Sequence, residues 1–208
     1  MPAARRCVAS IAAALALFSA GSGASLRAAE FSAGGYSFSD ELGGFRLLSA
    51  AGSGTPDDPI VVKEEFVDVA PVTLVIRNHQ FLWKRGGIGQ SQLTLVKQVK
   101  NASNRIWAGF EIELQEARGE PSDYGDGLSF KQFAVEAPDV ASDVFMQNER
   151  LFEPADRIEF RNGHVDPDAS VMFRVTITDP TPAAEFYLVQ DPKLLSSSLP
   201  SGKSFAAR

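Results

Sequence analysis

Hydrophobic and polar residues alternate with a period of two along most of the chain after about residue 30, as in half-buried β-strands. The clearest run is VMFRVTIT, in which every second position from Val171 to Ile177 is apolar. Asp168 precedes this run and Asp179-Pro180 follows it. One face of the segment is therefore predicted to be buried and the other to face water. Comparable runs lie at residues 72–77, 110–115, 45–47, 158–160 and 186–188.

Two further segments, Ile60–Val67 and Leu93–Val99, are strand-like with less regular alternation, which brings the prediction to about eight strands. Asn162-Gly163 favours a tight hairpin turn, because both residues tolerate positive φ. The turn that begins at Asn101 carries an acceptor sequence for N-glycosylation, which we expect at the surface. Gly, Pro, Asn and Asp mark further turns at residues 52–59, 101–104 and 180–182.

The helical pattern is much weaker than the strand pattern. The best candidate is Val140–Leu151, whose apolar residues are poorly spaced for one helix face, so we expect one short helix or none. Evenly spaced strands with Gly/Pro turns favour an all-β fold, namely a single antiparallel β-sandwich of Ig-like or jelly-roll-like type. The last strand is predicted to end near Gln190, which gives a sandwich domain at residues 30–190 and a flexible tail at 191–208.

The first 29 residues have a different pattern. A short basic start is followed by an Ala-rich apolar run from Cys7 to Ala20 and then by small residues, as in a secretory signal peptide. The run is shorter than the ~20 apolar residues that a membrane span needs. Cleavage is predicted after Ala24 or near Ala29, and the later position is favoured. We therefore expect a signal peptide at residues 1–29 and a secreted or periplasmic protein.

Removal of this segment changes the composition. Arg5, Arg6 and Arg27 leave with it, so the formal net charge falls from −6 to −9. The single cysteine, Cys7, leaves too, which excludes disulfides and thiolate metal sites from the rest of the chain. The acidic remainder has no Lys/Arg cluster larger than the pair Lys84-Arg85, which argues against nucleic acid as a partner. It also has no apolar run long enough to span a membrane.

Three segments together resemble uncharacterised secreted bacterial β-sandwich proteins: VKNASNRIWAGFEIEL, IEFRNGHVDPDASVMFRVTI and EFYLVQDP. In those proteins a strand ends in Asn and a small hydroxyl residue, and Trp and Phe open the next strand. The resemblance covers roughly residues 95–190. It implies a β-sandwich fold and export, since members are often anchored at the cell envelope, and it transfers no catalytic residue to this chain.

Signatures of common enzyme classes are missing from the sequence. The only histidines, His79 and His164, have no second histidine at metal-ligand spacing, and no G-x-S-x-G nucleophile motif follows the first 29 residues. Glu111 and Glu113 lie two residues apart on one predicted strand, about 7 Å from each other, which suits the acid pair of a glycoside hydrolase. Because alternating Glu also solvates an exposed strand, we assign no catalytic residue and do not expect an enzyme.

The loop ARGEPSDYGDG at residues 117–127 is the strongest candidate binding region. Asp123, Tyr124 and Asp126, with the glycines between and after them, could place oxygen atoms around Ca²⁺. The spacing does not follow the EF-hand register, and Asp and Gly are equally typical of an ordinary turn. We therefore take these three residues as candidate binding residues, assign no metal ligand, and expect no cofactor, with Ca²⁺ as the alternative.

These observations predict an exported, non-catalytic binding or structural module of the cell envelope or extracellular space, with an unidentified protein or glycan partner. A first alternative is a carbohydrate-binding or glycan-active protein that uses the aromatics Trp83, Trp107 or Tyr124, with Glu111 and Glu113 as its acids. A second alternative is a subunit of an envelope assembly, in which an unpaired edge strand captures a partner.

Overall fold

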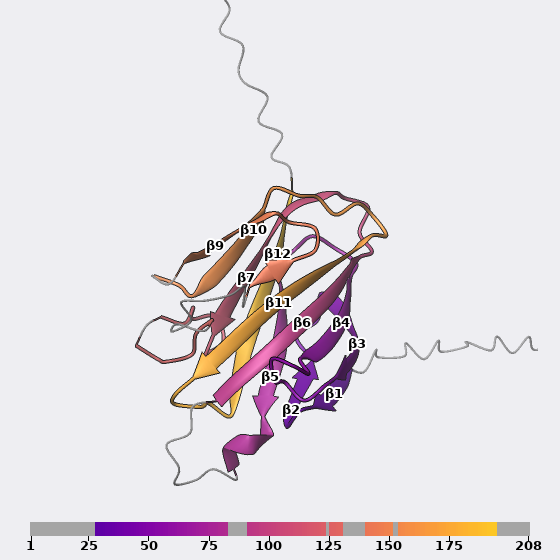
Figure 1. The fold of residues 1–208 in the computed structure, drawn as a ribbon. Helices are drawn as coiled ribbons and strands as arrows, with labels where there is room; N and C mark the ends of the chain where they lie inside the picture. Colours follow the sequence, from indigo (N-terminus) through magenta and orange to yellow (C-terminus); the bar gives the residue numbers. More distant parts are fainter. Residues whose placement is uncertain (1–27, 83–90, 124, 131–139, 152–153, 195–208) are drawn as a thin grey trace, which may run out of the picture.

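The computed structural model describes residues 28–82, 91–123, 125–130, 140–151 and 154–194. Within these residues the chain forms two β-sheets packed face to face, with one 3₁₀ turn, η1 (His79–Leu82), and no α-helix (Figure 1). The all-β class predicted from the alternation is therefore confirmed. The strands are β1 (Glu30–Ala33), β2 (Tyr36–Ser39), β3 (Phe45–Ala51), β4 (Ile60–Phe66), β5 (Val72–Asn78), β6 (Ser91–Asn101), β7 (Trp107–Gln115), β8 (Ala141–Ser142), β9 (Gln147–Leu151), β10 (Arg157–Arg161), β11 (Ser170–Asp179) and β12 (Glu185–Leu194).

Seven strands make sheet A, in the order β1-β2-β5-β12-β7-β10-β9, and five make sheet B, in the order β3-β4-β6-β11-β8. Every neighbouring pair is antiparallel except β4 and β6, which are parallel. The predicted antiparallel arrangement therefore holds for the described strands except at this pair. The chain leaves sheet B after β4, crosses to sheet A as β5, and returns as β6, and such a crossover connection is what parallel neighbours require.

All eight predicted strands are confirmed, and the described residues add β1, β2, β8 and β9. Of the two expectations for Val140–Leu151, one short helix or none, the second holds, and this segment contains β8 and β9. Strand β8 pairs with β11 in sheet B, and β9 pairs with β10 in sheet A. The segment thus passes from the edge of one sheet to the edge of the other, and this pairing overrides a weak local pattern.

Strand β12 reaches Leu194, beyond the end predicted near Gln190. Up to Gln190 the strand is paired on both sides, with β5 and with β7. From Asp191 onward only the β7 pairing continues, so Pro192, which has no N–H, occupies a part of the strand with one unpaired side. The remaining tail residues, 195–208, lie outside the described part of the chain.

The core lies between the two sheets and is rich in phenylalanine. Phe173 of β11 stacks on Phe110 of β7 with ring centroids 4.5 Å apart, so these two rings connect the sheets. Trp107 is fully buried, 5.7 Å from the ring of Phe66. These rings provide much of the apolar area that holds the cysteine-free part of the chain together.

The hairpin predicted at Asn162-Gly163 is wrong, because β10 and β11 belong to different sheets. Asn162 does have positive φ, at 60°, but Gly163 does not. Gly163 is needed for a different reason: a Cβ built on it would lie 2.4 Å from the carbonyl oxygen of Val144. The pair therefore lets the chain leave sheet A close to the segment between β8 and β9.

At one side of the two-sheet structure, Asp40 connects an edge of sheet A to an edge of sheet B. Its carboxylate accepts hydrogen bonds from the amides of Ala29, at 2.7 Å, and Leu47, at 2.9 Å, which ties the β1–β2 hairpin to β3. The opposite side carries the edge strands β8 and β9, which follow each other along the chain. The described residues place no further strand beside β9.

Candidate functional site

Three adjoining hollows lie on the molecule where β9, β10 and β7 run side by side in sheet A. Their volumes are about 570, 400 and 770 Å³. They are connected because Met146, Ala108, Glu159 and Arg161 each line two of them. We call this region the Arg161 surface and define it by Ala108, Gly109, Glu111, Met146, Glu149, Glu159, Arg161 and Lys193.

A β-bulge in β7 shapes the floor of the middle hollow. Lys193 is the partner of Gly109 and Leu194 is the partner of Trp107, so Ala108 is the extra residue. The bulge changes the alternation, and Trp107 points into the core with no exposed surface. Gly109 leaves the floor open, since a Cβ there would lie 3.0 Å from the carbonyl oxygen of Phe160.

Four acidic residues cross sheet A in one row. Glu149 of β9 is the register partner of Glu159 of β10, Glu159 is the partner of Glu111 of β7, and Glu111 is the partner of Asp191 of β12. Neighbouring strands are about 4.8 Å apart, so each carboxylate has like charges beside it. Such a row is unfavourable unless cations lie between its members.

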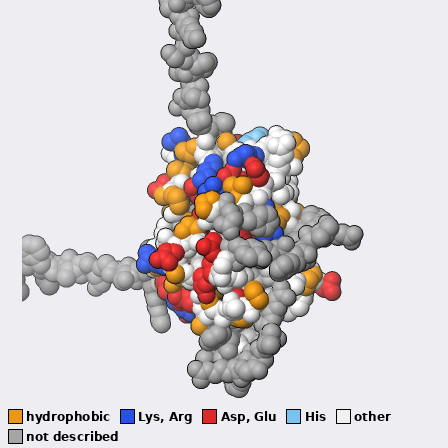
Figure 2. Space-filling view, turned by 90° about the vertical axis from the view of Figure 1, so that its left-hand side faces the viewer, with side chains coloured by type: hydrophobic (Ala, Val, Ile, Leu, Met, Phe, Trp, Pro, Cys, Tyr) orange, Lys and Arg blue, Asp and Glu red, His pale blue; other side chains and the backbone are white. Residues whose placement is uncertain are grey.

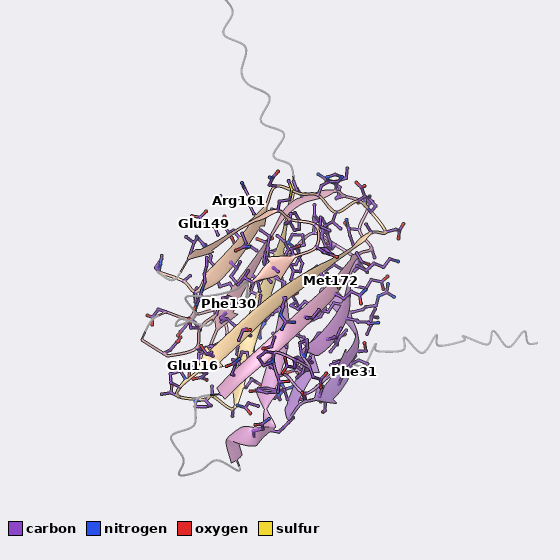
Figure 3. The ribbon with its side chains drawn as sticks, in the orientation of Figure 1. Phe31, Glu116, Phe130, Glu149, Arg161 and Met172 are labelled. Carbon is purple, nitrogen blue, oxygen red and sulfur yellow. The ribbon has the colours of Figure 1, made fainter. Side chains whose placement is uncertain are left out.

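Two cations lie beside this row. Arg161 is 3.4 Å from a carboxylate oxygen of Glu149 and also pairs with Glu159, and Figure 3 shows Arg161 and Glu149 together at one end of sheet A. Lys193 lies 3.5 Å from Glu111 and also pairs with Asp191. Partial burial lowers the pKa of Lys193, but the hydrogen bond and charge of Asp191 and the charge of Glu111 outweigh it, so the net pKa is raised.

Apolar side chains complete the Arg161 surface. Met146 is 78% exposed and Ile106 is 43% exposed, and both line the same hollow. Figure 2 views the molecule from the side of β9 and β10, where acidic, basic and hydrophobic side chains are intermingled. The arrangement offers a flexible apolar contact, a net negative row of charges and the edge of β9, beside which the described residues place no strand.

The predicted acid pair lies on the outer face of β7, and only Glu111 belongs to the Arg161 surface. Glu111 belongs to the charge row, whereas Glu113 accepts a hydrogen bond from the side-chain amide of Gln115 at 2.8 Å. The proposed aromatic neighbour Trp107 is not beside them, because the bulge turns it inward. Trp83 lies outside the described residues.

The predicted loop at residues 117–127 uses its carboxylates for its own backbone. Asp123 accepts a hydrogen bond from the amide of Gly125 at 2.6 Å, and Asp126 accepts one from the amide of Leu128 at 2.9 Å. Tyr124 lies outside the described residues. Among those described, no group of three His, Cys, Asp or Glu side chains could hold a metal ion. The hydrogen bonds explain the Asp and Gly of this loop as turn residues.

Three further acids near this loop have raised pKa values. Burial is the main cause for Glu116, Asp156 and Asp179, and the negative charge of Asp126 raises the pKa of each further. For Asp156, hydrogen bonds from Ser129 and from the amide of Phe130 oppose the rise but do not cancel it. Figure 3 shows Glu116 well away from Arg161, so these acids are separate from the Arg161 surface.

Sequence reasoning named Glu111 but missed the rest of the Arg161 surface. Its charged residues come from four strands that are adjacent in the sheet and distant along the chain. Without the strand order, no spacing in the sequence relates Glu149 or Glu159 to Asp191. The two histidines do not contribute a cluster: His79 and His164 are both exposed, and His164 has Asp166 at 3.9 Å.

Comparisons with known proteins give no relative for this chain. No protein-family model, no curated protein and no solved structure matches it. The resemblance to secreted bacterial β-sandwich proteins therefore stays a prediction. In the described part of the chain, no helix has the length and apolar character that crossing a membrane requires.

Proposed function

We propose that the protein is an exported, non-catalytic β-sandwich binding module of the cell envelope or extracellular space, and that the Arg161 surface contacts its protein partner. Export is supported by the leader-like pattern of residues 1–29. The sandwich architecture is supported by two packed sheets with a common core. The resemblance to secreted β-sandwich proteins points in the same direction.

One observation carries the binding site: Met146 is a large apolar side chain, 78% exposed, beside a row of acids and the edge of β9, which has no neighbouring strand among the described residues. The row contains four carboxylates and two cations, which leaves an excess of negative charge. A partner that fits presents an apolar side chain to Met146 and basic side chains to the row. Strand β9 can add main-chain hydrogen bonds to an extended segment of that partner.

The proposal that the protein is not an enzyme is supported by the ion pairs of the surface acids. Glu111, Glu149 and Glu159 each lie in an ion pair with Arg161 or Lys193, as expected for residues that form a recognition surface. The glycan alternative depends on aromatic side chains against which a sugar can stack. Trp107, the candidate nearest the acids, has no exposed surface and cannot supply that contact.

The test measures capture of a partner from an envelope extract of the source organism by the wild-type full chain and three variants of it. Glu149→Lys reverses a charge on a half-exposed side chain, and we expect about tenfold weaker capture by this variant. Capture by the wild-type chain should also weaken at high salt, because salt screens the charges of the row. Met146→Ala should reduce capture similarly. Met172→Ala is the matched control, since Met172 is an exposed methionine on β11 of sheet B.

Equal capture by all forms would contradict the assignment of the Arg161 surface. Binding on a glycan array, or glycan hydrolysis that Glu111→Gln abolishes, would favour the carbohydrate alternative instead. Light scattering separates the assembly alternative, because a chain that self-associates through β9 forms larger species at high concentration. A monomer that binds a basic partner is the outcome expected here.

A further inference from the structure

A polar cluster lies in the core between the two sheets. Lys97 of β6 and Glu64 of β4 are fully buried, and the Nζ of Lys97 is 2.7 Å from the Oε1 of Glu64. Gln190 of β12, in the opposite sheet, is also fully buried. Its Nε2 donates to the same Oε1 of Glu64 at 3.5 Å. A single carboxylate oxygen therefore contacts both an amine and an amide, which come from strands of different sheets.

This cluster is incompletely hydrogen-bonded within the described residues. Glu64 Oε2 and Gln190 Oε1 are buried and have no hydrogen-bond partner there. Each such atom has lost its hydration without compensation, which disfavours the folded state. A buried ion pair also gives little net stability relative to apolar side chains of similar volume. The three residues are thus poorly explained as an ordinary stabilising contact.

The surroundings favour a reactive amine. Burial lowers the pKa of Lys97, and the charge and hydrogen bond of Glu64 oppose this effect without reversing it. A lowered pKa favours the neutral amine, which is the nucleophilic form of lysine. Packed sheets lie about 10 Å apart, a distance that the side chains of Lys97 and Gln190 span when joined end to end. Because the core holds the amine of Lys97 and the amide of Gln190 near each other, their reaction does not require a chance encounter.

We propose that Lys97 and Gln190 form an intramolecular isopeptide bond that joins sheet B to sheet A, with Glu64 transferring the proton. The neutral Nζ attacks Cδ of Gln190, and a Cδ–Nζ bond forms. Glu64 takes a proton from Nζ and delivers it to Nε2, after which the Cδ–Nε2 bond breaks and ammonia leaves. One amine and one primary amide thus become one secondary amide and one ammonia, with no oxidant or other reactant.

The bond would give the chain a covalent link that its cysteine-free part otherwise lacks. It would connect β6 and β12, two strands with neighbours on both sides in their own sheets. Because all three side chains are inaccessible to solvent, water is kept from the amide that forms. Isopeptide formation involves core residues only, so a test of this proposal does not depend on whether the Arg161 surface binds a partner.

Intact mass spectrometry of the purified full chain tests the proposal. The reference mass is calculated from the N-terminus that sequencing of the same sample identifies. We expect a mass lower than this reference by one ammonia molecule, in denaturant as well as in buffer. After proteolysis, one linked species should contain both Lys97 and Gln190. A wild-type chain at the reference mass would overturn the proposal, as would loss of one water molecule with a link between Lys97 and Glu64.

Variants of the cluster test the role of each group. Lys97→Met removes the nucleophile and keeps an unbranched apolar side chain of similar length, and Glu64→Gln removes the carboxylate that transfers the proton. Both variants should have the full reference mass. Lys100→Met is the matched control, since Lys100 also lies on β6 but is 41% exposed and pairs with Glu65. The control should keep the mass deficit, and a deficit that persists in Lys97→Met would refute the assignment. If a variant does not fold, the intact mass of the wild-type chain and the presence or absence of its linked peptide still test the proposal.

Discussion

Asn101 is a fully buried side chain that organises the turn between β6 and β7. Its amide nitrogen donates to the carbonyl oxygens of Arg105, at 2.8 Å, and Val165, at 3.1 Å. Its amide oxygen accepts from both the backbone and the hydroxyl of Ser103. The sequence predicts a surface asparagine within a glycosylation acceptor, and that prediction of exposure is wrong, because the polar groups of the turn point inward to this side chain.

Asn101→Ala should therefore destabilise the protein strongly. The substitution removes one donor from the carbonyl oxygens of Arg105 and Val165 and the shared acceptor of the Ser103 amide and hydroxyl, all in a buried setting. We expect a loss of about 2–4 kcal/mol in the free energy of unfolding. Urea denaturation followed by tryptophan fluorescence measures this loss. Asn104→Ala, at an exposed position of the same turn, should change the value by less than about 0.5 kcal/mol. Equal effects of the two variants would contradict this account of the turn.

At the scale of the strands, alternation predicted the long elements well. Strand β11 has the most regular pattern and lies where expected. Strands β4 and β6 look less regular because Glu64 and Lys97 occupy positions in phase with buried apolar neighbours. Gln190 has the same relation to Phe186 and Leu188. A polar residue in the apolar phase of a strand was the available signal for the buried cluster.

The short edge strands could not be predicted from local pattern. Strand β8 has two residues and β9 has the sequence QNERL, so neither has enough apolar positions to show a period. Both exist because a longer strand, β11 or β10, offers them a pairing edge. The local pattern did not predict the bulge at Ala108 either. Because of this bulge, Trp107 is buried and Gly109 lines a hollow. Tertiary pairing supplies this information.

Phe173 tests the predicted faces of β11. Its ring lies 4.5 Å from that of Phe110, 4.7 Å from that of Phe160 and 6.1 Å from that of Phe145. Phe173→Ala removes contacts between the two sheets, and we expect a loss of about 3–5 kcal/mol in unfolding free energy. The neighbour Met172 points outward, and Met172→Ala should cost less than about 0.5 kcal/mol. Chemical denaturation of both variants measures the difference, and similar losses would mean that the assigned faces are reversed.

At the scale of the whole molecule, the proposed binding surface depends on an order of strands that the sequence does not reveal. The Arg161 surface combines residues from β7, β9, β10 and β12, which the chain visits over almost ninety positions, from Trp107 to Leu194. The predicted loop at Asp123 and Asp126 is contiguous in sequence and was therefore easy to notice. Its carboxylates turn out to serve local backbone amides. Contiguous motifs favour turns in this chain, whereas the surface site is assembled by the sheet.

The acids with raised pKa values predict that the stability of the fold depends on pH. Glu116, Asp156 and Asp179 have pKa values above their ordinary ones in the folded state, mainly because burial disfavours the carboxylate. The stability that such groups contribute is fully present below the unfolded pKa and is lost as the pH rises through the folded pKa. Glu41 acts in the opposite sense, because its hydrogen bond from Arg77 lowers its pKa. That pair is partly exposed, so solvent screening reduces its contribution.

We therefore expect the acids with raised pKa values to favour the folded state as the pH is lowered from 7 toward the ordinary carboxylate range, because in the folded protein they take up protons before ordinary carboxylates do. Differential scanning calorimetry over this range measures the resulting change in melting temperature. Glu116→Gln removes one raised acid without removing a hydrogen bond among those described for its side chain, so it should stabilise the protein at pH 7 and reduce the pH dependence. Glu120→Gln, at an exposed position of the same loop, should leave the pH dependence unchanged. A melting temperature that falls steadily as the pH is lowered in the wild type would show that ion pairs such as Glu41 with Arg77, rather than the buried acids, dominate the electrostatics of the fold.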